Sequence, residues 1–413
     1  MRRHTRFFIL ACAGVFAVGA GTSPPPAAQR REPAPGDTAL TSAIAEIEAG
    51  RRTTPLIGEP TAGGGATVTF LAQRRGRHVP RIVSDVTGWG EHTDGTFDFT
   101  AGSMKRVAGT AWYSLQANVA PRARIEYLIA YAATDFRTDP HNPRRSAGPQ
   151  FGGAPASEFV MPGYVPPPEF ADPPISPAGL TSDATVESRL LRGSYRLVVY
   201  TPVGYRDDGA YPTAVFLDSR SAQVSRVLDW LIAHEAIEPI VAVFVVSNGE
   251  GGDSGRGAPM REFLTDELPP WLASRYGVTR SAGKRAIIGI SYGARDALDA
   301  AGVWGAVPGT ADAPERQTSP FGRVGLLIPG RRITRADLDA IAERRTHRLQ
   351  VAIMAGEYDH ANVATARGLR QALAGAGHVV DYTEVPEGHS AVTWTHHLRT
   401  VLVSLFGRGR SGP

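Results

Sequence analysis

The sequence predicts an α/β protein with a doubly wound, mostly parallel sheet, preceded by a small β-sandwich. From Ser194 onward, short apolar runs alternate with helical patterns, as in βαβ units. Between Ala66 and Tyr131, short alternating runs are separated by turn residues instead, which is typical of a sandwich. With 413 residues, 42% of them hydrophobic, the chain is long enough for two domains with separate cores.

The first residues predict export. Residues 1–6 are basic and residues 7–20 are apolar and small, which is the pattern of a signal peptide. The apolar run is shorter than the roughly 20 residues that a spanning helix needs. We therefore expect residues 1–28 to contain a signal peptide and the start of a linker. The mature protein would be periplasmic or secreted, with no stable membrane anchor after cleavage.

The remaining boundaries follow composition and periodicity. Residues 29–60 are predicted as a linker that could hold one short helix over 38–51, and residues 61–146 as the β-sandwich. Residues 147–185 are a Pro/Gly-rich bridge, and residues 186–413 form the α/β domain. Its predicted strands are 195–200, 213–217, 240–246, 285–290, 324–328, 349–355 and 379–385. Its predicted helices are 222–234, 261–276, 335–345, 361–374 and 393–405.

The segment Gly289–Gly293 is the most informative motif. It has the form G-x-S-x-G and lies between an apolar strand and a helical pattern, the setting in which a serine becomes a nucleophile elbow. A serine hydroxyl is a weak nucleophile at neutral pH, so it needs a base and an oxyanion site. The motif therefore predicts Ser291 as a catalytic nucleophile.

Candidates for the other two catalytic groups follow in the chain. His389 lies between the last strand and the last helix, and Asp359 follows an earlier strand, giving the Ser, Asp, His order of α/β-hydrolases. We expect His389 to be the base and Asp359 to orient its imidazole. Glu357 is an alternative acid, whereas His396 and His397 fall inside a predicted helix and are less suitable bases.

The oxyanion site should use backbone N–H groups. Tyr292, which follows the nucleophile, supplies the first donor, and Ser219 or Arg220, after the strand 213–217, supplies the second. Arg331 and Arg332 follow another strand at the edge of the sheet where ligands bind. With Arg220 they could form a cationic entrance for an anionic substrate.

The composition narrows the functional classes. The excess of 44 Lys+Arg over 40 Asp+Glu is mild, and no basic stripe interleaved with aromatic residues predicts nucleic-acid binding. Cys12 is the only cysteine and lies in the predicted signal peptide, so the mature chain can form neither a disulfide framework nor a thiolate metal site. No metal or organic cofactor is expected in catalysis. The expected partner is a small-molecule ester, and the sequence leaves the oligomeric state unknown.

Several segments resemble the enterochelin (enterobactin) esterase family of the esterase D group. The resemblance rests on Asp139–Pro143, Glu267–Trp271, Gly289–Gly293 and Glu387–His389 and covers nearly the whole mature chain. It implies that the sandwich is an immunoglobulin-like, early-set domain. It also implies hydrolysis of an ester backbone, typified by the trilactone of a catecholate siderophore. Cleavage of that trilactone releases the bound ferric iron. Ser291 and His389 match the family pattern well.

The chain departs from the family pattern after three strands. Ser219 replaces a glycine, the residues around Gly330 replace an aromatic-tipped segment, and Arg295 falls on a helix face that is usually packed. We expect Arg295 to form a buried ion pair, with Asp296 or Asp299 as the partner. Two other functions stay open. One is a carbohydrate esterase that removes acetyl or feruloyl groups from polysaccharide, and the other is an inactive exported binding protein of the same fold.

Overall fold

The computed structural model describes residues 35–92, 96–149, 155–217, 221–245, 257–304, 319–330, 332–343 and 347–408. Its N-terminal domain consists of two antiparallel sheets. The first sheet has the order β1-β2-β5-β4, and the second has the order β3-β6-β9-β8 with β7 paired to β6. The strands are β1 (Leu56–Pro60), β2 (Ala66–Gln73), β3 (Arg81–Ser84), β4 (Lys105–Arg106), β5 (Trp112–Val119), β6 (Arg124–Ala132), β7 (Asp135–Arg137), β8 (Arg145–Pro149) and β9 (Pro155–Val160).

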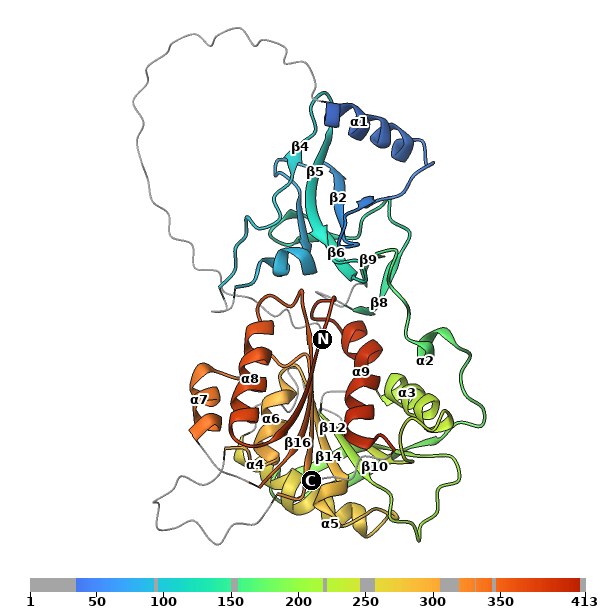
Figure 1. Cartoon of the computed structure of the whole chain (residues 1–413), viewed down its shortest axis with the longest axis vertical. Helices are drawn as coiled ribbons and strands as arrows, with labels where there is room; N and C mark the ends of the chain where they lie inside the picture. Colours follow the sequence, from blue (N-terminus) through green and yellow to red (C-terminus); the bar gives the residue numbers. More distant parts are fainter. Residues whose placement is uncertain are drawn as a thin grey trace, which may run out of the picture.

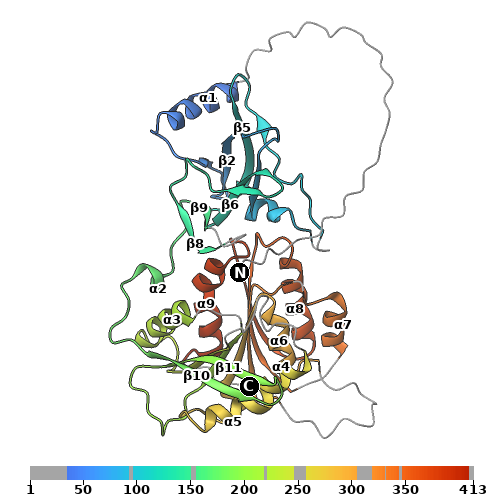
Figure 2. The same cartoon turned by 180° about the vertical axis from the view of Figure 1, so that it is seen from behind.

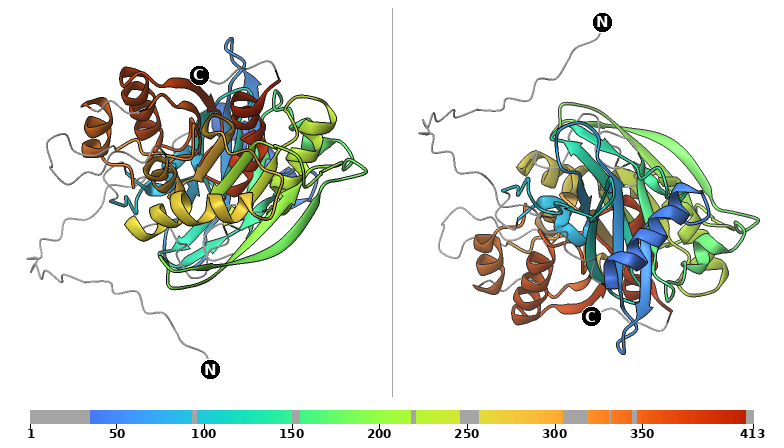
Figure 3. Two further views of the ribbon diagram at one scale, coloured as in Figure 1. Left: turned by 90° about the horizontal axis from the view of Figure 1, so that it is seen from below. Right: turned by 90° about the horizontal axis from the view of Figure 1, so that it is seen from above.

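Both sheets share one apolar core, in which Phe70, Tyr127 and Phe159 pack edge to face. Helix α1 (Pro35–Glu48) covers a second cluster beside the first sheet, as the view from above shows (Figure 3, right). Two boundaries differ from the prediction. Leu56–Pro60 was predicted as linker but pairs with β2, and Pro155–Val160 was predicted as bridge but pairs with β6. The sequence did not predict these strands because their side chains do not alternate clearly between buried and exposed, and because both segments carry prolines.

The C-terminal domain contains an eight-stranded sheet in the order β10-β11-β13-β12-β14-β15-β16-β17. From β13 to β17 every neighbouring pair is parallel, which confirms the predicted doubly wound α/β sheet. The strands are β10 (Leu180–Ser188), β11 (Gly193–Thr201), β12 (Thr213–Leu217), β13 (Val241–Val245), β14 (Arg285–Ile290), β15 (Arg323–Leu327), β16 (Gln350–Gly356) and β17 (Val379–Val385). The edge strand β10 was not predicted, because most of its side chains are exposed and give no apolar run.

Helices cover both faces of this sheet (Figures 1 and 2; Figure 3, left). One face packs against α3 (Ser221–Ala233) and α9 (Ala391–Phe406). The other packs against the remaining main helices, which are α4 (Ala258–Glu262), α5 (Leu268–Ala273), α6 (Gly293–Ala300), α7 (Arg335–Glu343) and α8 (Val363–Gly375). The predicted helix 261–276 is divided, because a π-helical turn, η3 (Phe263–Glu267), and two prolines at the start of α5 interrupt it.

The β-sandwich lies above the end of the sheet at which the parallel strands finish (Figures 1 and 2). A short helical turn of the sandwich, η1 (Asp85–Gly90), faces this end, and the bridge containing α2 (Pro168–Ala171) connects the domains along one side. Ligands bind at the carboxyl ends of strands in open α/β sheets. The N-terminal β-sandwich therefore lies directly over the expected site.

Candidate active site

Ser291 occupies a strained turn between β14 and α6. Its φ of 52° lies in the left-handed region, which is unusual for a residue other than glycine. Its N–H donates to the carbonyl oxygen of Leu327 at 2.9 Å. A Cβ added at Gly289 would overlap the carbonyl of Gly293, so the strand and helix can approach this closely only because position 289 is glycine. This is the geometry of a nucleophile elbow, in which the serine hydroxyl is presented above the sheet.

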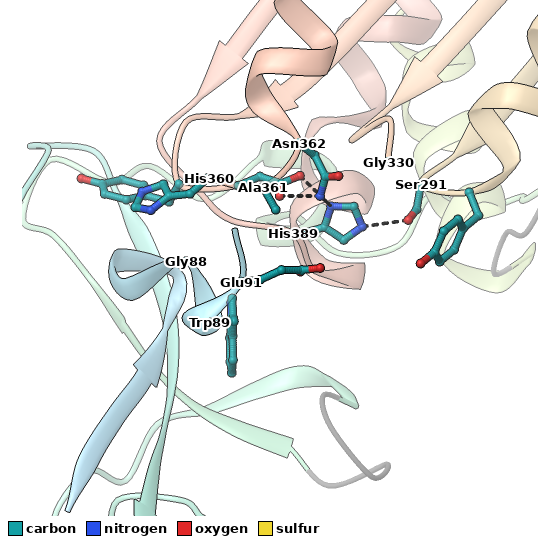
Figure 4. Close-up of a pocket in the computed structure, with 12 residues that line it drawn as sticks. Gly88, Trp89, Glu91, Ser291, Gly330, His360, Ala361, Asn362 and His389 are labelled. Carbon is teal, nitrogen blue, oxygen red and sulfur yellow. Dashed lines mark hydrogen bonds and ion pairs between the residues drawn. The ribbon is translucent and has the colours of Figure 1, made fainter. Parts of the chain in front are cut away.

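The structure brings His389 and Asp359 to this serine. Figure 4 shows His389 beside Ser291. The Ser291 Oγ lies 2.8 Å from His389 Nε2, and His389 Nδ1 lies 2.6 Å from Asp359 Oδ2. His389 comes from the loop between β17 and α9, and Asp359 from the turn between β16 and α8. The three side chains form one continuous hydrogen-bonded relay, although the residues are spread over almost a hundred positions of the chain.

The electrostatics of His389 suit a base. Burial by itself lowers the pKa of His389, but the charge and hydrogen bond of Asp359 outweigh burial, with smaller contributions from Glu91 and Asp85, so the pKa is raised. A neutral imidazole can accept the serine proton, and the neighbouring carboxylate stabilises the imidazolium that results.

Asn362 is a member of this site that sequence reasoning missed. Its Nδ2 donates to Asp359 Oδ1 at 2.7 Å and lies 3.5 Å from His389 Nδ1. Asn362 stands at the N-cap of α8 but makes no capping hydrogen bond, because its side chain is used on Asp359 instead. Both carboxylate oxygens of Asp359 are therefore held in place. The sequence signal that could have indicated this role is an asparagine three residues after Asp359, at the start of a predicted helix.

The alternative residues lie elsewhere. The Glu357 side chain is exposed and does not line the cavity. His396 Nδ1 lies 3.0 Å from the hydroxyl of Tyr164, and His397 Nε2 lies 2.7 Å from Glu387 Oε1. Both histidines are thus used within the interface that α9 makes, away from Ser291.

Of the backbone groups predicted for the oxyanion site, only Tyr292 lies in the described part of the chain. Its N–H directly precedes α6, where the positive end of the helix dipole favours negative charge. Ser219, Arg220 and Arg331 fall outside the described residues. Arg332 is described, and its Nη1 lies 3.0 Å from Asp296 Oδ2, on the elbow helix rather than in the cavity.

Arg295 does not form the ion pair that was predicted. Its Nη2 lies 3.1 Å from Asp337 Oδ1, at the first turn of α7, and its side chain is 31% exposed rather than buried. Asp296 instead engages Arg332, because successive residues of a helix point in different directions. Burial tends to raise the pKa of Asp337, but hydrogen bonds from Thr334 and from Arg295 outweigh it and lower that pKa.

A cavity of about 200 Å³ opens beside Ser291. Its walls come from both domains, since η1 and the residue after it contribute one side (Figure 4). The sequence did not indicate this contribution, because nothing local marks the turn around Trp89 as facing another domain. The lining residues are Gly88, Trp89, Glu91, Ser291, Tyr292, Gly330, Tyr358, Asp359, His360, Ala361, Asn362 and His389.

Among the described residues, no three or more His, Cys, Asp or Glu side chains are grouped so that they could hold a metal ion. Within the same described ranges, no helix is both long and apolar enough to cross a membrane.

Part of the chain that includes Ser291 is similar to known esterases. Residues 188–302 match the protein-family model described as "Putative esterase". No curated protein sequence matched the chain.

Two solved structures of enterobactin esterases match over most of this chain. The ferric enterobactin esterase of Salmonella typhimurium matches with a TM-score of 0.64 and 19% identity, covering 86% of this chain and 96% of its own. The enterobactin esterase of Shigella flexneri, determined in the presence of enterobactin, matches with a TM-score of 0.63 and 19% identity, covering 86% and 96%. A feruloyl esterase module of Clostridium thermocellum matches with a TM-score of only 0.46 and 14% identity, covering 60% of this chain and 96% of its own.

The family model and the two enterobactin esterase structures confirm the resemblance found in the sequence and support the predicted carboxylic ester hydrolase. The family model covers the elbow around Ser291, and the two structures cover enough of the chain to include the sandwich as well. Residues 188–302 thus resemble esterases in sequence, and the chain shares the fold of the enterobactin esterases.

Proposed function

We propose that the protein is a serine esterase that works through an acyl-enzyme. Ser291 Oγ attacks the ester carbonyl carbon while His389 Nε2 accepts the hydroxyl proton, and Asp359 holds the imidazole in the required orientation. The Tyr292 N–H stabilises the oxyanion. His389 then gives the proton to the leaving alcohol, and a water molecule activated by the same imidazole releases the acid. The observation that carries this proposal is the unbroken relay of 2.8 and 2.6 Å from a serine held at positive φ.

The first candidate substrate is the ester backbone of a catecholate siderophore. Support comes from the likeness to enterobactin esterases, which extends over 86% of the chain and therefore includes the N-terminal domain. That domain would be the immunoglobulin-like, early-set module that the family resemblance implies. An inactive binding protein is less favoured, because a Ser–His contact within hydrogen-bond reach is what catalysis requires.

A second candidate substrate is an acetyl or feruloyl ester of a polysaccharide. The observation in its favour is that the aromatic residues Trp89, Tyr292 and Tyr358 are among those that line the cavity. Sugar rings and feruloyl groups pack on such surfaces. Arg332, by contrast, is engaged with Asp296 and does not line the cavity, so the cationic entrance expected for an anionic substrate rests on Arg220 and Arg331, which lie outside the described residues.

The decisive experiment compares three esters with the mature protein: p-nitrophenyl acetate, a ferric catecholate trilactone and a feruloylated arabinose. Ser291→Ala serves as the control in each reaction. We expect serine-dependent cleavage of p-nitrophenyl acetate together with the trilactone. Cleavage of the feruloyl ester but not of the trilactone would replace the first substrate by the second. No serine-dependent cleavage of any ester would contradict the esterase proposal.

We also propose that the protein is exported, on the basis of the basic and apolar residues at its start. Expression of the full chain in a Gram-negative host, followed by fractionation and N-terminal sequencing, tests this proposal. A periplasmic or secreted product cleaved near residues 20–28 is expected. A cytoplasmic product that keeps Met1 would contradict it.

A further inference from the structure

The β-sandwich contacts the catalytic domain at the two loops that carry Asp359 and His389. In the acid loop, the hydroxyl of Tyr358 accepts the N–H of Ala120 at 2.8 Å, and the tyrosine ring packs against the sandwich core. In the base loop, a Cβ added at Gly388 would overlap the carboxylate of Asp85. Tyr358 and Gly388 directly precede the catalytic candidates Asp359 and His389.

Arg124 makes the strongest link between the domains. It lies on β6, is only 2% exposed, and is ion-paired with Glu126 and, at 2.9 Å, with Glu158, both in the sandwich. Its Nη1 also lies 3.3 Å from Glu387 Oε2 in the catalytic domain. In addition, the backbone N–H of Arg124 donates to the carbonyl oxygen of Pro386 at 3.3 Å. One residue of the sandwich thus holds both the main chain and a side chain of the base loop.

Glu387 connects this link to the rest of the site. It is 1% exposed, and its second carboxylate oxygen lies 2.7 Å from Nε2 of His397, on α9. Its backbone carbonyl accepts the N–H of Tyr358, at 3.1 Å, from the acid loop. Glu387 therefore joins the base loop, the acid loop and the following helix, and it stands two residues before His389.

Buried charges of this kind are immobile. A buried carboxylate that loses its cationic partner is left uncompensated in a medium of low dielectric constant, so the pair holds its geometry closely. A displacement of about 1 Å at a catalytic group is enough to reduce turnover about 100-fold. The elbow around Ser291 makes its backbone hydrogen bonds within its own domain, so a loosened base loop would change the Ser291–His389 distance.

We propose that Arg124 is a positioning residue for His389: through its ion pair with Glu387, the β-sandwich sets the geometry of the acid and base loops relative to Ser291. The inference rests on the proposed esterase function and deepens it. The sandwich then affects the chemical step with every ester. Because neither Arg124 nor Glu387 lines the cavity, variants of these residues leave the substrate contacts in place. If the sandwich only bound the substrate, such variants would keep the wild-type kcat.

The test uses p-nitrophenyl acetate as the small ester and the full mature chain. The variants are Arg124→Met, Arg124→Lys and Glu387→Gln, and Arg144→Met is the matched control. Arg144 is an exposed arginine of the same domain that approaches Glu158 at 3.5 Å. Activity is measured below the lowest melting temperature of the set and expressed per active site, after titration with diethyl p-nitrophenyl phosphate.

We expect Glu387→Gln and Arg124→Met to lower kcat about 10- to 100-fold with little change in KM, as seen for groups that orient catalytic ligands. Arg124→Lys should recover part of the loss, because it restores the charge but not the full set of hydrogen bonds. Combining Glu387→Gln with Arg124→Met should cost no more than the larger single loss, because both act through one contact. Arg144→Met should match the wild type.

Two results would overturn the proposal. One is a wild-type kcat per titrated site in Glu387→Gln, which decides the question even if Arg124→Met fails to fold. The other is a loss confined to the melting temperature or to KM. The failure of the proposed function itself looks different, since the wild type would then hydrolyse the ester no faster than Ser291→Ala.

Discussion

The two halves of the catalytic relay are held in contrasting ways. The elbow that carries Ser291 is fixed by backbone geometry and by hydrogen bonds inside the catalytic domain, to Leu327 and from Gly330. The loops that carry Asp359 and His389 also make backbone hydrogen bonds, but they are held in addition by the β-sandwich, through the N–H of Ala120 and the side chain of Arg124. The nucleophile is thus a local construction, whereas the acid and base depend on contacts between residues far apart in the chain.

The difference has a physical origin. The turn around a serine at positive φ leaves no room for a side chain at Gly289, so part of the constraint is visible in the sequence. The acid and base loops also contain glycines without room for a Cβ, Gly356 and Gly388, but the contacts at these loops join residues far apart in the chain. Glu387, for example, pairs with Arg124, 263 positions earlier.

The largest expected effect is that of Ser291→Ala. Removing the nucleophile should lower kcat for p-nitrophenyl acetate by about 10⁴-fold or more, leaving only the contribution of the oxyanion site and of binding. The fold should be intact, because the variant changes only the side chain on a turn that the backbone holds. Steady-state kinetics measures the loss of kcat, and a thermal melt shows whether the fold is intact. Retention of more than a few per cent of activity would place the nucleophile elsewhere.

Asp359→Asn should have the next largest effect. An asparagine keeps the shape but loses the charge that favours the imidazolium, and it can impose the wrong imidazole tautomer, so kcat should fall about 10²- to 10⁴-fold. The loss should stay below that of Ser291→Ala. Equal losses in the two variants would mean that the acid is as indispensable as the nucleophile.

Asn362→Leu is the matched comparison for that variant. It leaves Asp359 charged but removes the 2.7 Å hydrogen bond to Oδ1. A loss of about 10-fold is expected, in line with the effect of other orienting partners. A loss as large as that of Asp359→Asn would show that Asn362 does more than hold the carboxylate.

Gly388→Ala tests whether the position of the base loop depends on its contact with the β-sandwich. The added methyl group would overlap the carboxylate of Asp85, so the base loop has to move away from the sandwich. We expect kcat to fall about 10- to 100-fold. Gly375→Ala is the control, since a Cβ there meets nothing within 4 Å. Equal activity of the two variants would show that the base loop tolerates separation from the sandwich.

Asp85→Asn should have the smallest effect on activity. Its main effect should be on the pH dependence of stability. Burial, together with the nearby charge of Glu126, raises the pKa of Asp85 to about 7, against the opposing effects of hydrogen bonds from Glu126 N–H and Trp89 and of the charge of Arg124. The unfolded value is about 4. Between these values only the folded chain holds the proton on Asp85. The contribution of Asp85 to stability is therefore fully present below about pH 4 and is lost as the pH rises through about 7.

Thermal melts between pH 5 and pH 8 should therefore show a decline that Asp85→Asn flattens. Asp208→Asn, which changes an exposed carboxylate, should keep the wild-type decline. An Asp85→Asn curve parallel to that of the wild type would contradict the account of Asp85.

The sequence was sufficient for the features that local geometry imposes. Continuous apolar runs identified the central parallel strands, and the glycines around Ser291 identified the elbow. The exposed edge strand β10 left no such pattern. Arg124 and Glu126 would be taken for the solvated face of β6, yet both are almost fully buried, because the carboxylates of two domains surround the guanidinium. No pattern within β6 indicates a partner that only folding brings near.

The most direct test of the catalytic account is a titration with diethyl p-nitrophenyl phosphate. One equivalent of p-nitrophenol should be released per chain, and peptide mapping should locate the diethyl phosphoryl group on Ser291. His389→Ala should slow the burst strongly, because the hydroxyl then lacks its base. A burst that persists in Ser291→Ala, or an adduct on another residue, would contradict the account.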